Sequence, residues 1–174
     1  MNPPDPLFQS LAASWLDGQT EILLRLVWLG HDRLRRNAAA INSADLERSI
    51  TQLLEPRIRA EMTGFEPFYI QHGPYERETM ALPPAQPPQY DLAFVWRADE
   101  RIMWPLEAKV LETPGQVSDY VRDVREEFLK CRYAPFTSGG AMLGYLISGQ
   151  ASKALDNIEL SLGCKLHKVP AFSS

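Results

Sequence analysis

The stretch QYDLAFVWRADERIMWPLEAKVL, residues 89–111, contains two apolar runs separated by the polar segment 97–101. Such runs around a polar turn predict two β-strands that pair as a hairpin. Side chains alternate between the two faces of a strand, so Glu107 and Lys109 point to the same side. The hairpin carries Asp91, at the start of the first strand, back towards Glu107. Two carboxylates and a lysine then form one patch, which suits a divalent cation and a phosphate.

An acidic residue at the start of one strand, followed by Glu-x-Lys in the next, resembles the PD-(D/E)xK nuclease superfamily, also called restriction-endonuclease-like. The resemblance implies that Asp91 and Glu107 bind Mg²⁺, together with a backbone carbonyl next to Glu107, and that Mn²⁺ can substitute for Mg²⁺. It also implies that Lys109 positions or activates the attacking water, or stabilises charge on the phosphate. Tyr90 stands where the family's motif has a proline, with Pro87 and Pro88 slightly earlier.

The composition is that of one globular domain: 174 residues, of which 45% are hydrophobic and 23% charged. The net charge is -4 and the pI is about 5.4, so no global basic field favours nucleic acid. A nuclease of this composition needs local basic patches, metal ions or a partner. Cys131 and Cys164 form neither a disulfide framework nor a zinc pattern. Without a signal-peptide pattern or a membrane-spanning apolar run, we expect a cytoplasmic protein that does not enter a membrane.

Apolar spacing predicts three helices before the hairpin, over residues 6–17, 19–41 and 44–62. Asn42 or Ser43 is the expected N-cap of the third helix, and Pro56 is expected to kink or break it. The second helix ends in an arginine cluster, which fits either a solvated helix end or a phosphate contact; its members are Arg33, Arg35 and Arg36.

Glu47 lies at the edge of the apolar stripe of the third predicted helix. The nuclease resemblance implies that a glutamate on the helix before the sheet completes the metal site. Glu47 is therefore a candidate metal ligand and catalytic residue, with Glu55 and Glu61 as weaker ones. The alternative is a surface glutamate that the helix dipole stabilises.

Residues 67–71 are predicted to form the first strand, and the proline-rich segment 72–89 a long loop that walls the active cleft. Pro105 lies in the predicted third strand, which is central in the nuclease fold. Because proline donates no ladder hydrogen bond, a bulge at Trp104-Pro105 that re-aims Glu107 is expected there.

Residues 117–131 predict a helix, 141–148 a strand buried on both faces, 150–160 a last helix and 164–170 a short closing strand. In many nucleases of this type, the helix after ExK contributes a residue near the scissile phosphate. The available residues are Gln116, Tyr120 and Lys130, and a structural role is the alternative for each.

The predicted fold class is α/β. The order of helix, three strands, helix and strand over residues 42–148 resembles the restriction-endonuclease-like αβββαβ core, with a mixed central sheet flanked by helices. Residues 1–41 are then an N-terminal helical extension and residues 149–174 a C-terminal helix and strand of the same single domain.

The function that the resemblance implies is an Mg²⁺-dependent nuclease that hydrolyses phosphodiester bonds, with DNA as the expected substrate. A bacterial restriction or phage-defence system is the implied setting, with a homo-oligomer or a partner protein of a defence complex. The first alternative is a catalytically inactive nuclease-like subunit that binds nucleic acid or a partner protein. The second is an interaction subunit in which Glu107 and Lys109 form a structural ion pair.

Overall fold

The structure, a computed structural model, describes residues 6–36, 45–76, 87–130 and 136–169. The described elements, in chain order, are α1 (Pro6–Gly18), α2 (Thr20–Arg36), α3 (Leu46–Arg59), β1 (Phe68–His72), β2 (Leu92–Trp96), β3 (Met103–Leu111), α4 (Ser118–Asp123), the π-helix η1 (Val124–Phe128), β4 (Ala141–Leu146) and α5 (Ala151–Leu162). The α/β class is confirmed, and so is the predicted order of helix, three strands, helix and strand.

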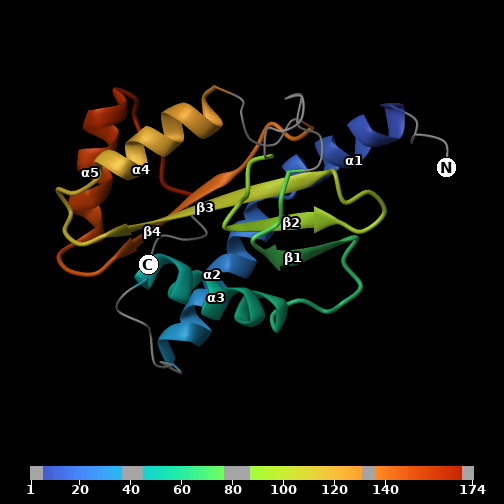
Figure 1. The fold of residues 1–174 in the computed structure, drawn as a ribbon, viewed down its shortest axis with the longest axis horizontal. Helices are drawn as coiled ribbons and strands as arrows, with labels where there is room; N and C mark the ends of the chain where they lie inside the picture. Colours follow the sequence, from blue (N-terminus) through green and yellow to red (C-terminus); the bar gives the residue numbers. More distant parts are fainter. Residues whose placement is uncertain (1–5, 37–44, 77–86, 131–135, 170–174) are drawn as a thin grey trace.

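The described strands form one mixed sheet in the order β1-β2-β3-β4. Strand β2 pairs antiparallel with both β1 and β3, whereas β4 pairs parallel with β3. The chain between β3 and β4 includes α4 and η1, as a parallel connection requires a crossover. In Figure 1, α4 and α5 lie together at the end of the sheet to which β3 runs. The hairpin predicted from residues 89–111 is present as β2 and β3.

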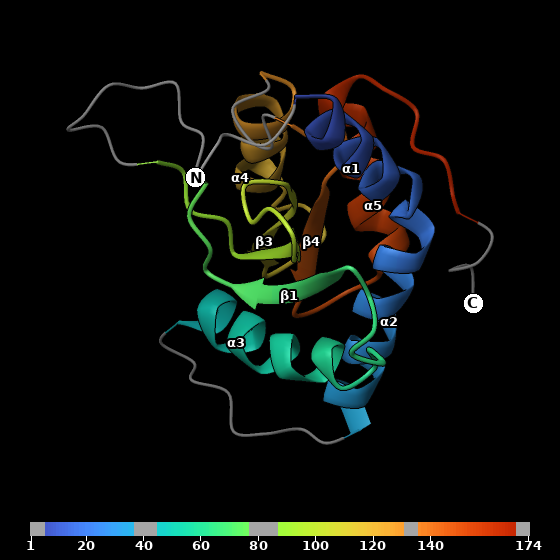
Figure 2. The ribbon, with the colours of Figure 1, turned by 90° about the vertical axis from the view of Figure 1, so that its right-hand side faces the viewer.

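The two faces of the sheet are covered by different helices. Phe94, Trp104 and Leu106 are buried on one face, in a core that includes side chains of α1, α2 and α3. At the far end of β3, Leu111 packs instead with Val121 of α4 and with α5. Figure 2 shows α2 and α3 on the side of β1 that faces away from α4. The sheet is therefore a middle layer, with the start of α3 and the end of α4 on opposite sides of it.

Helix α2 meets α3 at Gly30, where the two backbones approach closely. A Cβ atom at this position would lie 2.7 Å from Cγ1 and 2.9 Å from the backbone nitrogen of Ile58, which is fully buried. We expect Gly30→Ala to lower the free energy of unfolding by about 1–3 kcal/mol, because a backbone atom cannot yield as a flexible side chain does. Gly18→Ala, which would meet nothing within 4 Å, is the control, and urea denaturation measures both. Equal midpoints for the two variants would contradict this packing.

Helix α3 differs from the prediction at its start and at its proline. Asp45 is the N-cap, since its side chain accepts a hydrogen bond from the backbone N–H of Arg48; Asn42 and Ser43 lie outside the described residues. Of the kink or break predicted at Pro56, the break is wrong, because the helix continues to Arg59. The proline removes one backbone donor, but its own carbonyl accepts from Ala60 N at 3.0 Å, so the next turn still forms.

The predicted bulge at Trp104-Pro105 is also wrong, because the register between β2 and β3 is continuous and pairs Pro105 with Ala93. Trp96 N donates to Ile102 O at 3.0 Å, and hydrogen-bonded pairs alternate with non-bonded ones in an antiparallel ladder. Pro105 therefore falls in a non-bonded pair, and its nitrogen faces the β4 side. Pairing with β4 starts only at Leu106, so a central strand accommodates this proline without a missing ladder bond.

Three C-terminal predictions need correction. Strand β4 is half-buried rather than buried on both faces, because it forms an edge of the sheet among the described strands. The helix predicted over 117–131 is divided into α4 and the π-helix η1, and Cys131 lies outside the described residues. Residues 164–169 form no strand, since the chain folds back on α5, where Leu166 N donates to Glu159 Oε2 at 2.8 Å.

Candidate functional site

Strand β3 runs past the start of β2, and this overhang creates the site (Figure 1). The ladder between the two strands ends at the pair Leu92 and Leu106, so the next N–H groups of β3 on that side have no strand partner. Asp91 Oδ2 accepts from Ala108 N at 2.7 Å, and Glu47 Oε2 accepts from Val110 N at 3.3 Å. Both predicted carboxylates thus continue the ladder beyond the end of β2.

The ammonium group of Lys109 lies among three carboxylates and a carbonyl. Its Nζ atom is 3.2 Å from Glu47 Oε1, 3.4 Å from Glu107 Oε1 and 3.2 Å from Asp123 Oδ2. It also donates to the carbonyl of Ala108 at 2.9 Å. Burial alone would lower the pKa of Lys109, but the carboxylates of Glu107 and Glu47 outweigh burial and hold the pKa above its usual value. Lys109 is therefore a permanent cation at neutral pH.

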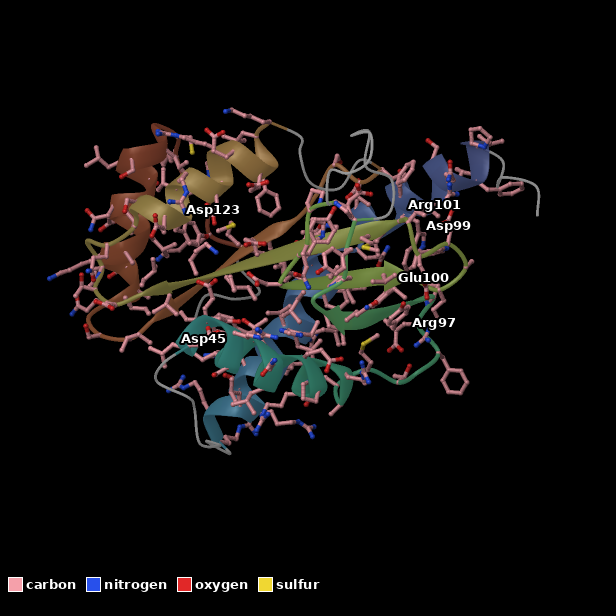
Figure 3. All side chains as sticks on the ribbon, in the orientation of Figure 1. Asp45, Arg97, Asp99, Glu100, Arg101 and Asp123 are labelled. Atoms are coloured by element: carbon pink, nitrogen blue, oxygen red, sulfur yellow. The ribbon has the colours of Figure 1, made fainter. Side chains whose placement is uncertain are left out.

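The structure adds one residue to the predicted set, Asp123. It is the last residue of α4, directly before η1, and it also contacts Nε of Arg122 at 3.1 Å. In the sequence it is one of many charged residues on a predicted helix face, with no motif to distinguish it. Figure 3 shows Asp123 and Asp45 at the end of the sheet opposite the hairpin turn, which carries Arg97, Asp99, Glu100 and Arg101. The site therefore draws on α3, α4, β3 and the residue that directly precedes β2.

Glu107 is the carboxyl group of the cluster whose ionisation is most strongly disfavoured. Its side chain points to the same side as Lys109, as predicted, and is 11% exposed. Burial and the neighbouring Asp91 raise the pKa of Glu107 to about 8, although Lys109 acts in the opposite direction. The second carboxyl oxygen, Oε2, is buried without a hydrogen-bond partner among the described residues. A buried unpaired oxygen of this kind costs roughly 1–3 kcal/mol and calls for a functional explanation.

Two carboxylates of this site can hold a divalent cation. Within the described ranges no three His, Cys, Asp or Glu side chains form a group that could hold a metal ion, since the carboxylates converge on Lys109. Mg²⁺, however, is typically held by only one or two carboxylates, with water and phosphate oxygens as its other ligands. Asp91 and Glu107 supply that pair, and the unpartnered Oε2 of Glu107 is a suitable ligand atom.

The other predicted site residues form hydrogen bonds or ion pairs with residues other than Lys109. Tyr120 donates to the carbonyl of Met142 at 3.3 Å, and burial raises the pKa of its hydroxyl to about 12. Gln116 is exposed and accepts a hydrogen bond from Thr113. Lys130 is exposed and pairs with Glu126 along the helix. Their predicted role as substrate ligands remains a prediction.

The weaker glutamate candidates are engaged in ion pairs elsewhere. Glu55 pairs with Arg59 one turn along α3, and Glu61 pairs with Arg33 of α2 at 2.6 Å. Arg33 of the arginine cluster is thus held at the junction of α2 and α3.

Cys164 is an exposed free thiol. Among the helices of the described ranges, none has the length and apolar character to cross a membrane.

Comparisons of this chain with protein-family models, with curated proteins and with solved structures found no match. The functional argument therefore depends on the geometry of the site.

Proposed function

We propose that this protein is a Mg²⁺-dependent nuclease with a restriction-endonuclease-like core, and that its expected substrate is DNA. One observation carries the proposal: Asp91, which directly precedes β2, meets Glu107 and Lys109 of β3 at the point where β3 leaves β2. The order α3, β1, β2, β3, α4, β4 and the mixed sheet support it as well. The implied setting is a bacterial defence system, with a homo-oligomer or a partner protein.

In this proposal Asp91 and Glu107 hold the cation, and Glu47 orients the site from α3. When bound, Mg²⁺ supplies a Lewis acid that lowers the pKa of a water ligand and neutralises charge on the phosphate. Lys109 acts as a charge rather than as a base, because its raised pKa keeps the proton on Nζ. Its ammonium stabilises negative charge that develops on the phosphate, a type of contribution that is commonly the largest in such sites. Asp123 and Glu47 keep that ammonium in position.

A second candidate is a nuclease-like subunit that binds nucleic acid or a partner protein without cutting. It is favoured by the saturation of Lys109, whose Nζ already contacts three carboxylates and a carbonyl. In this candidate Asp91 and Glu47 serve only to continue the ladder of β3.

Cleavage of plasmid DNA, single-stranded DNA and RNA by the purified protein tests the proposal. With Mg²⁺ or Mn²⁺ we expect cutting that EDTA abolishes and that Asp91→Asn reduces by a factor on the order of 10³ or more, as for loss of a key electrostatic group. Glu112→Gln is the matched acid control, because Glu112 is exposed just beyond β3. Cutting that persists in EDTA, or in Asp91→Asn, would refute metal-dependent catalysis at this site. No cutting of any substrate would favour the binding subunit.

A further inference from the structure

A polar cavity adjoins the carboxylates of the site. It has a volume of about 310 Å³ and lies between the start of α3, the end of β1 and the residues that precede β2. Its lining residues are Asp45, Glu47, Arg48, His72, Gly73, Gln89, Tyr90 and Asp91. Glu47 and Asp91 belong both to this wall and to the contacts that cap β3, so the cavity opens directly beside the proposed cation site.

The walls of the cavity are held by hydrogen bonds between its own segments. Gly73 N donates to Asp91 O at 2.9 Å, and Gln89 Nε2 donates to Gly73 O at 2.9 Å. Gly73 has a φ of +64°, a left-handed conformation that favours glycine at this turn of the wall. Tyr90 is 1% exposed and belongs to a buried cluster with Ala93, Val95 and Met103. The cavity is thus a formed feature of the fold.

Arg48 is a cationic residue of the cavity wall, and its position does not stabilise helix α3. It stands in the first turn of α3, where a positive charge opposes the helix dipole and is usually unfavourable. Its backbone N–H bonds to Asp45, but among the described residues no partner exists for its guanidinium, which is exposed. A guanidinium with free donors beside a cation site is well suited to a phosphate group.

Resting on the proposed function, we propose that this cavity binds the nucleotide next to the scissile phosphate, with Arg48 bound to that nucleotide's own phosphate. A volume of 310 Å³ is at the low end for a small-molecule pocket, which spans roughly 300–1,000 Å³, so there is room for one unstacked nucleotide. Three acidic residues, Asp45, Glu47 and Asp91, line this space together with Arg48 and His72. This excess of acidic groups makes nucleotide binding dependent on the divalent cation.

Arg48→Gln tests the inference, and Arg25→Gln, which changes an exposed arginine of α2, is its control. With a short single-stranded DNA and Mg²⁺, we expect Arg48→Gln to raise KM on the order of tenfold, as for one charge-assisted hydrogen bond, and to leave kcat nearly unchanged. The Tm should stay equal or rise slightly, since an unfavourable charge leaves the helix start. An unchanged KM, or a loss of Tm that matches the loss of activity, would overturn the inference while the nuclease proposal stands.

A binding experiment separates this inference from the failure of the proposed function. The probes are a fluorescein-labelled single-stranded oligonucleotide and thymidine 5′-monophosphate, with Ca²⁺ in place of Mg²⁺ so that bound strand persists. Binding that needs Ca²⁺ and is about tenfold weaker in Arg48→Gln supports the cavity as a nucleotide site, even if the wild type cuts nothing. Equal binding by both proteins, or no binding by either, overturns it.

Discussion

Lys109→Met is expected to abolish cleavage and to lower the free energy of unfolding by about 3–5 kcal/mol in metal-free protein, as when one partner of a buried ion pair is removed. The Lys109 side chain is 17% exposed and is the shared partner of Glu47, Glu107 and Asp123. Without it these carboxyl groups repel one another in a partly buried site. Urea denaturation in EDTA measures the loss, and Lys153→Met, which removes an exposed lysine of α5, is the control.

Divalent cations should reverse part of this loss. Because Lys109→Met leaves the carboxylates without their ammonium, added Mg²⁺ or Ca²⁺ should raise the Tm of the variant more than that of the wild type. A variant as stable as the wild type in EDTA would mean that the ammonium does not hold the cluster together. A variant that loses stability and ignores metal would argue for an ion pair with a structural role only.

Glu107→Gln is expected to make the metal-free protein more stable at alkaline pH while it removes activity. The pKa of Glu107 is about 8 in the fold, raised by burial and by Asp91 from an ordinary value of 4.5. A raised carboxyl pKa contributes stability that is present in full below pH 4.5 and is lost as the pH rises towards 8. The difference amounts to a few kcal/mol, on the order of 3–5. Glutamine carries no such charge, so the variant escapes this loss.

The measurement compares urea denaturation of both proteins in EDTA at pH 5 and pH 9. Equal pH dependence would show that Glu107 ionises normally in the fold. The exposed control Glu112→Gln should follow the wild type at both pH values.

The raised pKa of Glu107 also predicts how metal binding depends on pH. Because this pKa is about 8, Mg²⁺ binding to the wild type at pH 7 should release a proton from Glu107, so the apparent affinity for Mg²⁺ should rise with pH up to about 8. Calorimetry in buffers of different ionisation enthalpy detects that proton.

The convergence of Asp91, Glu107 and Lys109, which the sequence predicted, depends on local rules. Strand alternation is sufficient to put Glu107 beside Lys109, and a hairpin is sufficient to bring Asp91 back to them. Glu47 lies on the edge of a helical stripe and became a candidate through the nuclease resemblance; it reaches β3 at Val110 N. The inferences about Glu107, Lys109 and Asp91 each span one element or one turn.

The parts that were missed depend on contacts between distant segments. Asp123 reaches Lys109 from the end of α4, and nothing in its neighbourhood distinguishes it from Asp119. The continuity of β3 through Pro105 depends on where β4 begins to pair, which is decided by residues after 136. The strand predicted over 164–170 is not formed in the described residues 164–169, because the N–H of Leu166 donates to the side chain of Glu159 in α5 rather than to a neighbouring strand.

The overhang of β3 also has a spectroscopic consequence. The amide protons of Ala108 and Val110 are bonded to carboxylate oxygens of Asp91 and Glu47 rather than to peptide carbonyls. An amide proton resonance shifts when the charge on its acceptor is neutralised or shared with a cation. In a ¹H–¹⁵N spectrum these two backbone signals are therefore native sensors of the site: each reports on one carboxylate, without any added label, as metal or substrate arrives.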